Sequence, residues 1–293
     1  AGKTTTLRLI SGLDNPDSGT ILIDGADAIP LSPAHRNVAM VFQQYSLYPH
    51  MTVRENLTFP LKSPLLRTPV GEIERIIGQV TEILHISGKL DNKATELSGG
   101  EMQRVSIGRA LVRSPSVFLM DEPLSSLDAK LRSDLRVELK RLQVTLGATL
   151  LYVTHDQIEA MTMATHVGVL DHGELVQFGT PREIYENPVS IYAASRLGSP
   201  KINILPADLF PGAPLKAEKI GLRPEHISLS KGGNAQAIQL ERLGDQTRLH
   251  IKINNYDLIT LTEAHTSIKA GDSLEVVPQS PIYFDTSGNR IRS

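Results

Sequence analysis

Three short apolar segments, each ending close to a polar side chain, constrain the fold of this 293-residue chain most strongly. The segments are Val38–Phe42 before Gln43, Val117–Met120 before Asp121 and Glu122, and Thr149–Val153 shortly before His155. In open parallel α/β sheets, ligands bind just beyond the carboxyl ends of the strands, which share one edge of the sheet. We therefore predict an α/β fold in which these polar side chains converge on one site.

A serine and two glycines mark a second part of the predicted site. Ser98 is followed three residues later by Glu101, a capping-box pattern that predicts a helix beginning at Ser98. Gly99 and Gly100 leave backbone N–H groups and the positive end of the helix dipole accessible to an anion. About twenty residues further on, the two strand-end acids have the chemistry to hold Mg²⁺ and polarise a water molecule. Together these segments predict machinery that splits a nucleoside triphosphate.

The first residues of the chain match the end of a phosphate-binding loop. Gly2, Lys3 and Thr4 fit the last three positions of G-x-x-x-x-G-K-[ST], and Thr4–Ile10 continues as a predicted helix. The first glycine of that pattern, three spacer residues and the preceding strand do not occur in this sequence. We therefore expect a fragment of a longer protein. In this fragment, the ring of backbone N–H groups that surrounds a β-phosphate would be incomplete.

Roles for the residues of the phosphate-loop match and of the strand ends follow from their chemistry. Lys3 is predicted to pair with the β- and γ-phosphates, and Thr4 with Asp121 to position Mg²⁺. Glu122 is placed to orient or deprotonate the attacking water, although it could also be a helix N-terminal acid. His155 has the strand-end position to contact the γ-phosphate.

Several of these residues have a simpler structural interpretation. Gln43 could hold the metal or the water, but its neighbour Gln44 could be the functional glutamine instead. Ser98 could act only as a helix cap. Asp128 could be the N-cap of the helix predicted over Asp128–Leu146, whose leucines follow one stripe.

The pattern of the chain changes near residue 197. Before it, isoleucine, valine and leucine recur at helical spacing between Ile73 and Leu84, and Gln157–Met163 is a further predicted helix. After it, prolines and glycines cluster and apolar residues alternate, as in Leu249–Ile253 and Leu258–Leu261. The expected domains are residues 1–196, with a helical subdomain over about 46–114, and a small all-β domain over 197–293.

Five motifs in fixed order resemble those of ABC-transporter ATPases. They are Gly2-Lys3-Thr4, Val41-Phe42-Gln43, Leu97–Arg104, Val117–Glu122 with Ser125–Asp128, and Tyr152–Asp156. Glu101 departs from the glutamine that the consensus signature carries after its glycines. The resemblance implies a P-loop NTPase fold, a RecA-like core with a helical subdomain, whose first strand and P-loop start are missing here. It also implies two paired subunits that sandwich ATP, with Ser98–Gln103 acting across the pair.

The resemblance implies specific ligand residues. ATP would be bound by Gly2, Lys3, Thr4, Thr5, Ser98, Gly99, Gly100, Gln103 and Asp128; Mg²⁺ by Thr4, Gln43 and Asp121; and the catalytic residues would be Glu122, His155 and Gln43. Tyr45–His50 and the helices after it resemble a surface that docks a transmembrane permease. The chain would thus work at the cytoplasmic face of the membrane, indirectly with a solute-binding protein.

The second half of the chain resembles a narrower group. Phe178–Pro181, Gly198–Asn203 and Gly221–Glu225 are similar to the ATPase subunits of maltose and glycerol-3-phosphate importers, which carry a C-terminal OB-like β domain. The expected function is ATP hydrolysis coupled to import of a sugar or sugar phosphate. The alternatives are an importer ATPase for polyamines, ferric iron or sulfate, a soluble ABC ATPase without a transport role, and a nucleotide-incompetent binding module.

Composition limits the other possibilities. A net charge of -2 gives no reason to expect nucleic acid as a partner. The absence of cysteine excludes disulfides and zinc–thiolate sites from this sequence. No apolar stretch reaches the length of about 20 residues that a membrane-spanning helix needs. Any role at a membrane is therefore expected to come through a partner.

Overall fold

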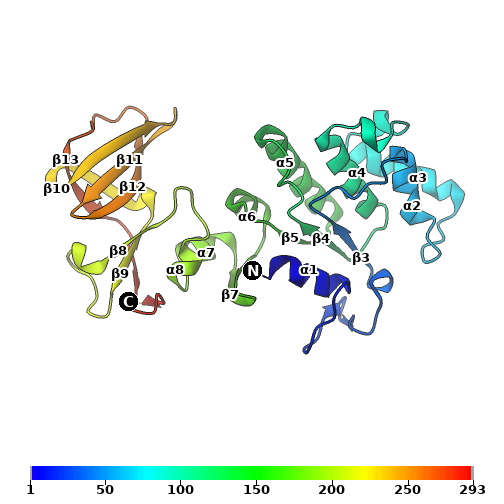
Figure 1. Ribbon diagram of the computed structural model, residues 1–293, viewed down its shortest axis with the longest axis horizontal. Coiled ribbons are helices and arrows are strands. Elements are labelled where there is room, and N and C mark those ends of the chain that lie inside the picture. Colours follow the sequence, from blue (N-terminus) through cyan, green and yellow to red (C-terminus); the bar gives the residue numbers. More distant parts are fainter. Residues whose placement is uncertain (1, 292–293) are drawn as a thin grey trace. The chain divides into compact units, whose positions relative to one another are not determined.

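The computed structural model describes residues 2–291, which fall into two compact units divided between Glu159 and Ala160 (Figure 1). The first unit contains a parallel sheet with helices, and the second consists mainly of antiparallel sheets. The domain boundary predicted between residues 196 and 197 falls inside the second unit and stays a prediction.

A three-stranded parallel sheet forms the centre of the first unit. Its strands are β3 (Val38–Val41), β4 (Val117–Asp121) and β5 (Thr149–Val153), in the order β3-β4-β5. Val41 pairs with Met120 and Asp121 pairs with Val153, so all three strands end at the same edge. The three strands predicted from the apolar segments are therefore confirmed.

Helices surround this sheet, and their ends agree with local sequence signals. Thr52 and Ser98 each form a capping box with the glutamate three residues on, which fixes the first turns of α2 and α4. Figure 1 shows α2, α3 and α4 as a group beside the sheet. The elements are α1 (Lys3–Ser11), the hairpin β1 (Leu22–Ile23) and β2 (Ala26–Asp27), α2 (Val53–Leu61), α3 (Val70–Ile83), α4 (Gly99–Leu111), α5 (Ala129–Leu146) and α6 (Gln157–Met163), with short 3₁₀ turns η1 (Pro33–His35), η2 (Ser87–Lys89) and η3 (Ala94–Glu96).

The second unit contains a hairpin, two short helices and two four-stranded antiparallel sheets. The sheets have the orders β12-β11-β10-β13 and β15-β14-β9-β8. The predicted β-rich C-terminal part is confirmed. The elements are β6 (Val167–Asp171), β7 (Glu174–Gly179), α7 (Pro181–Glu186), α8 (Ile191–Ala194), β8 (Asn203–Pro206), η4 (Ala207–Leu209), β9 (Lys219–Leu222), η5 (Pro224–His226), β10 (Ile227–Arg242), β11 (Gln246–Ile253), β12 (Tyr256–Glu263), β13 (Ser273–Pro278), β14 (Ile282–Phe284) and β15 (Arg290–Ile291).

Alternation of apolar and polar residues builds the core of this second unit. Leu249, Ile251 and Ile253 of β11 are buried, and they belong to one cluster with Leu222 and Leu258. Because successive side chains of a strand point to opposite faces, this spacing places one face of the sheet in the core and the other toward water.

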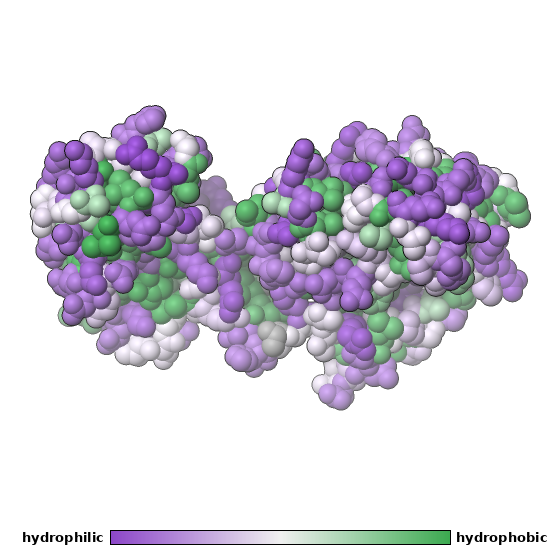
Figure 2. Space-filling view, turned by 45° about the horizontal axis from the view of Figure 1, so that its top comes forward, coloured by the Kyte–Doolittle hydropathy of each residue, from purple (hydrophilic) through white to green (hydrophobic). Residues whose placement is uncertain are grey.

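The surface carries hydrophobic side chains only in limited patches between hydrophilic ones in the view of Figure 2. Among residues 2–291, no helix combines the length and the apolar character required to cross a membrane.

Candidate functional site

The carboxyl edge of the parallel sheet brings together charged side chains from distant parts of the chain. The Nδ1 atom of His155 lies 2.9 Å from a carboxylate oxygen of Glu122. The Lys3 ammonium lies 3.8 Å from the other oxygen of Glu122 and donates a 2.8 Å hydrogen bond to the Thr154 carbonyl. The edge therefore unites the start of α1 with the loops that follow β4 and β5.

A hydroxyl and a carboxylate meet beside this cluster. Thr4 donates to the Oδ1 atom of Asp121 at 3.2 Å, and both side chains lie at the accessible edge. Oxygen atoms of this kind are the ligands that Mg²⁺ prefers, so Thr4 and Asp121 fit the predicted metal site. Gly2 forms the N-cap of α1 in a left-handed conformation, with a φ angle of 99°, and Thr5 is exposed on the first turn.

The backbone of Glu122 adopts an unusual conformation. Its φ angle is 47°, in the left-handed region that residues other than glycine seldom adopt. The Glu122 N–H donates to the Val153 carbonyl at 2.9 Å, and the Ser125 hydroxyl donates to the Glu122 carbonyl. Such conformations cost about 1–3 kcal/mol and persist where surrounding contacts hold them, often at functional sites.

A buried arginine holds the far end of α1. The Arg36 guanidinium donates to the carbonyls of Leu9 and Ile10 at 2.7 and 3.0 Å, and also to Leu31. Gly12, with a φ angle of 81°, ends the helix there, and a Cβ at this position would stand 2.6 Å from the Arg36 Nε atom. A glycine is therefore required for the arginine to reach the carbonyls at the end of α1.

The start of α4 has contacts separate from the strand-end cluster. Ser98 and Glu101 exchange the hydrogen bonds of a capping box, and the Ser98 N–H holds the pKa of the Glu101 carboxyl below its usual range. A Cβ at Gly99 would lie 3.2 Å from the Tyr45 hydroxyl, and one at Gly100 would lie 2.6 Å from a Leu131 methyl group. Their neighbours are thus Tyr45 and the region around Leu131 rather than Lys3 and Thr4.

Three other predicted ligand residues, Gln103, Asp128 and Gln43, differ in burial and in their contacts. Gln103 is fully buried, and within residues 2–291 neither atom of its side-chain amide has a hydrogen-bond partner, so this arrangement gives no support to its predicted nucleotide contact. Asp128 is the N-cap of α5 and accepts from the Leu131 N–H at 3.0 Å. Gln43 is exposed two residues beyond the end of β3. The ligand roles of all three stay predictions.

A buried carboxylate supports the loop that carries His155, and the sequence patterns did not indicate it. Glu159 is 3% exposed and accepts hydrogen bonds from the Thr154 hydroxyl at 2.6 Å and the Tyr152 hydroxyl at 3.1 Å. Burial, and then the Glu159 carboxylate, raise the pKa of Tyr152 above its ordinary value. The position of Glu159 four residues after His155 gives no distinctive spacing signal.

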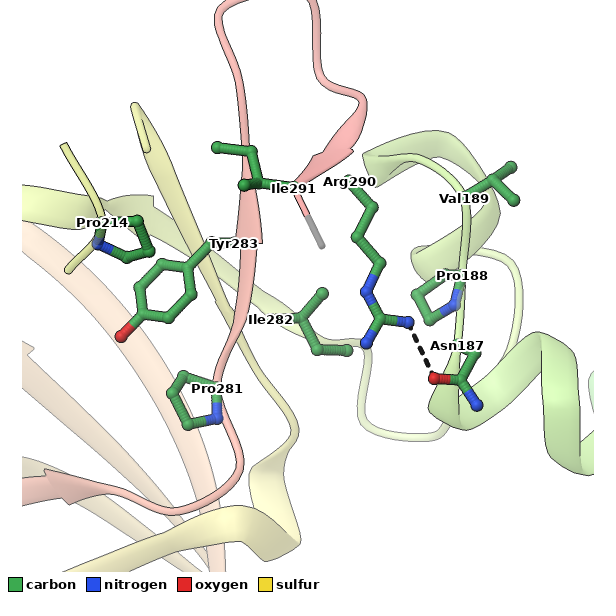
Figure 3. A pocket seen from close by; sticks show the side chains of 9 residues that line it. All are labelled: Asn187, Pro188, Val189, Pro214, Pro281, Ile282, Tyr283, Arg290 and Ile291. Atoms are coloured by element: carbon green, nitrogen blue, oxygen red, sulfur yellow. Dashed lines mark hydrogen bonds between the residues drawn. The ribbon is translucent and has the colours of Figure 1, made fainter. Parts of the chain in front are cut away.

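The second unit has a cavity of its own. It measures about 590 Å³, and Figure 3 shows Arg290 and Asn187 joined by a hydrogen bond on one side of the view, Tyr283 on the other, and Ile282 between them. Arg290 also donates to the Glu186 carbonyl. The guanidinium therefore joins β15 to the segment after α7, and the cavity contains none of the predicted site residues.

Comparison with known proteins shows which family the chain belongs to. A family model described as ABC transporter matches residues 1–125. The chain is 44% identical to the sn-glycerol-3-phosphate import ATP-binding protein UgpC of Rhizobium meliloti, over 99% of this chain and 88% of that protein. It is 42% identical to the protein of the same name from a Ruegeria species, again over 99% and 88%. The chain belongs to the ABC transporter family.

A solved structure supports the fold of this ABC protein. CbiO1 of Clostridium perfringens, described as part of the ABC transporter complex CbiONQ, superposes with a TM-score of 0.57 and 26% identity. The match covers 63% of this chain and 75% of that one. The predicted P-loop ATPase fold class and the resemblance to ABC ATPases are thus confirmed, whereas the individual site residues stay predictions.

Proposed function

We propose that this ABC protein is the ATP-binding and ATP-hydrolysing subunit of an importer for a sugar or sugar phosphate. The observation that carries the proposal is the convergence of Lys3, Thr4, Asp121, Glu122 and His155 at one edge of the parallel sheet. The relatives named as sn-glycerol-3-phosphate import ATP-binding proteins support the same function.

Each residue of the cluster has a task in phosphoryl transfer. Lys3 binds the β- and γ-phosphates of ATP, because its ammonium lies at the start of α1 beside the helix dipole. Glu122 orients the attacking water and accepts its proton, while His155 contacts the γ-phosphate and restrains the Glu122 carboxylate. Thr4 and Asp121 would hold Mg²⁺, which offsets negative charge on the phosphates when bound.

The proposal includes a paired ATPase subunit. Ser98 is exposed at the start of α4, where its backbone presents a helix N-terminus suited to a phosphate. Since its contacts within the chain are with Glu101 rather than with Lys3, the phosphate that it binds belongs to ATP held by the partner subunit. Binding of ATP would therefore close two subunits around two nucleotides.

A groove beside Gln43 is the proposed docking site for the permease at the cytoplasmic face of the membrane. The cavity measures about 480 Å³, and it is lined by residues that include Phe42, Tyr45, Phe59, Leu65, Leu66 and Arg109. Phe59 is 51% exposed, and Arg109 holds the groove wall through the Ser46 carbonyl and the Tyr48 ring. An apolar groove of this kind suits a short amphipathic helix of the partner.

The transported molecule is proposed from the relatives alone. Glycerol 3-phosphate is the first candidate because several relatives carry it in their names. Polyamine, ferric-iron and sulfate import are the alternatives within the family. Uptake of radiolabelled sn-glycerol 3-phosphate by cells with and without the gene tests the first candidate: uptake that depends on the gene would support it, and uptake that does not would reject it.

The test of the ATPase itself is Mg-ATP hydrolysis by the full-length protein beside a Glu122→Gln variant. Removing the carboxylate should lower kcat by about 10²–10⁴-fold while nucleotide binding persists. Mg-ATP at about 100 times Kd should stabilise both proteins by about 2.7 kcal/mol. The variant should also form an ATP-dependent dimer in light scattering.

Other outcomes would change the assignment. Stabilisation by Mg-ATP without hydrolysis in the wild-type protein would favour the nucleotide-binding module over the ATPase. A protein that neither binds nor hydrolyses ATP, with its permease supplied, would overturn the proposal. Equal hydrolysis by the wild type and Glu122→Gln would remove the catalytic role of Glu122 alone.

A further inference from the structure

Arg132, on the first turn of α5, contacts the backbone of the loop that follows Glu122. Its Nε atom donates to the Leu124 carbonyl at 3.2 Å, and its Nη2 atom donates to the carbonyls of Ser125 and Leu127 at 3.3 and 2.9 Å. Three carbonyls of one loop thus converge on a single guanidinium, whose planar group offers five N–H donors in fixed directions.

The same guanidinium faces the loop that follows β5. Its Nη1 atom lies 3.7 Å from the Oδ2 atom of Asp156, the residue directly after His155. The Oδ1 atom of Asp156 accepts from the Ile158 and Glu159 N–H groups at the start of α6, and the Asp156 N–H donates to the Thr154 hydroxyl. Asp156 is therefore fixed on its own loop, so the contact with Arg132 joins two restrained segments.

These two loops carry the two partners of the shortest contact between side chains in the site. Glu122 immediately precedes the loop that Arg132 holds, and His155 immediately precedes Asp156, with 2.9 Å between the two side chains. Glu122 also has the left-handed φ angle of 47°, a conformation that depends on the contacts of the following residues. A change in the separation of the loops would move the Glu122 carboxylate relative to His155.

We propose that Arg132 is a positioning residue that fixes the Glu122 loop against the His155 loop and so aligns the general base with its histidine partner. The inference rests on the proposed ATPase function for its catalytic consequence. The link between the loops does not depend on that function, because it is a property of Leu124–Leu127, Asp156 and the guanidinium.

A lysine cannot replace this arrangement. Its ammonium is a compact charge on a flexible stem, so it can pair with Asp156 but cannot serve three carbonyls and a carboxylate in one plane. Arg132→Lys is therefore expected to fall between the wild type and Arg132→Met. Arg136, one turn further along α5, has a side-chain hydrogen bond only to Ser133 within the described residues, so Arg136→Met is the matched control.

The first measurement is amide hydrogen exchange in the full-length protein without nucleotide. In Arg132→Met, amides of residues 124–128 and 154–159 should both exchange several-fold faster than in the wild type. Arg136→Met should leave both segments unchanged. Faster exchange in residues 124–128 alone would overturn the proposal, because Arg132 would then support only its own loop.

The second measurement separates positioning from general support. Since α1 carries the phosphate contacts and is not touched by Arg132, KM for Mg-ATP should stay within about twofold, whereas kcat should fall by about 10–100-fold, as expected for a misplaced catalytic group. Arg132→Lys should recover part of kcat. If Arg132→Met does not fold, the same measurements are made on Arg132→Lys and Asp156→Asn. Asp156→Asn should then lower kcat as expected for Arg132→Met, with an unchanged KM for Mg-ATP.

Hydrogen exchange and ATPase kinetics together distinguish a failure of the proposed function from a failure of the positioning role. A wild-type protein without ATPase activity would defeat the proposed function, while exchange in both loops would still show whether Arg132 joins them. Wild-type kcat in Arg132→Met would defeat the positioning role even if the ATPase assignment stands.

Discussion

Strands β3 and β4 of the first unit are four and five residues long and almost continuously apolar, whereas β10 and β11 of the second run for 16 and 8 residues. In β11, buried and accessible residues alternate through the whole strand. Every residue of these short strands is paired with a neighbouring strand, and the faces of such a parallel sheet are generally covered by helices. The long antiparallel strands hold one another.

The location of the chemistry follows this difference. Glu122 and His155 stand just after short strands, where the buried Glu159 holds the His155 loop and the buried Arg36 holds the end of α1. In the second unit, the buried Arg223 similarly donates to the carbonyls of Ala194, Leu197 and Tyr185, but it joins backbone segments without a neighbouring cluster of catalytic type. A buried arginine therefore holds backbone carbonyls in each unit, and among residues 2–291 the strand-end cluster lies in the first unit.

The largest effect should come from removing a core side chain from each unit. Phe284→Ala in the second unit is expected to lower the free energy of unfolding by about 3–5 kcal/mol, and Leu119→Ala in the first by about 2–5 kcal/mol, because both side chains are fully buried. Chemical denaturation with and without Mg-ATP measures both. If the units are as distinct as their cores indicate, Phe284→Ala should keep the Mg-ATP response and Leu119→Ala should weaken it. Loss of that response in Phe284→Ala alone would contradict this comparison.

A smaller effect is expected at the anchor of α1. Arg36→Met removes the guanidinium that donates to the carbonyls of Leu9 and Ile10. Leu9 keeps the hydrogen bond from the Gly12 N–H, whereas the partly buried Ile10 carbonyl loses its side-chain donor, a loss of about 1–3 kcal/mol. Because α1 carries Lys3, Kd for Mg-ATP should rise together with the loss of stability. Isothermal titration and urea denaturation give the two values, and the exposed Arg141 provides the control Arg141→Met. An unchanged Kd would limit Arg36 to a structural role.

The sequence predicted most of what depends on local patterns. The strands ending near Asp121 and His155, the helix beginning at Ser98 and the alternation in Leu249–Ile253 are all confirmed. Each of these follows from the residues of one segment, through apolar runs, a capping box or period-two spacing.

The roles of Arg36 and Arg132 could not be predicted from the sequence, because their partners lie far away along the chain. Arg36 contacts residues 26 and 27 positions earlier in the chain, and Arg132 reaches a residue 24 positions later. A polar residue on a helix or in a loop has no spacing signal that names its distant partner, and only the fold shows which carbonyls lie within reach. The hairpin of β6 and β7 was missed as well, because its alternation is interrupted by Gly168 and a register shift after Val169.

The smallest effects should arise at two capping boxes, one in each unit. Ser98 with Glu101 begins α4, and Thr180 with Glu183 begins α7, with the same reciprocal hydrogen bonds. In both, the backbone N–H of the cap residue is the main cause that holds the glutamate pKa below its usual value. The two capping boxes have the same chemistry and geometry. The same substitution in each therefore shows how strongly the stability of each unit depends on the start of one helix.

The sign of the pH dependence follows from these lowered pKa values. A carboxylate with a depressed pKa adds stability above its unfolded pKa of roughly 4.3, and the contribution disappears as the pH falls through the folded pKa. Glu101→Gln should therefore destabilise the protein by about 0.3–1 kcal/mol at pH 7, and the difference from the wild type should shrink as the pH falls below the unfolded pKa and through the lowered folded pKa. Urea denaturation at pH 7, 5 and 3 measures this, with Glu183→Gln as the counterpart in the second unit.

The two substitutions should differ in size. Because α4 has 13 residues packed against α2 and α3, whereas α7 has only six, Glu101→Gln should affect the unfolding transition of its unit more than Glu183→Gln affects that of its own. A larger effect at Glu183 would mean that the short helix, rather than the long one, limits the stability of its unit.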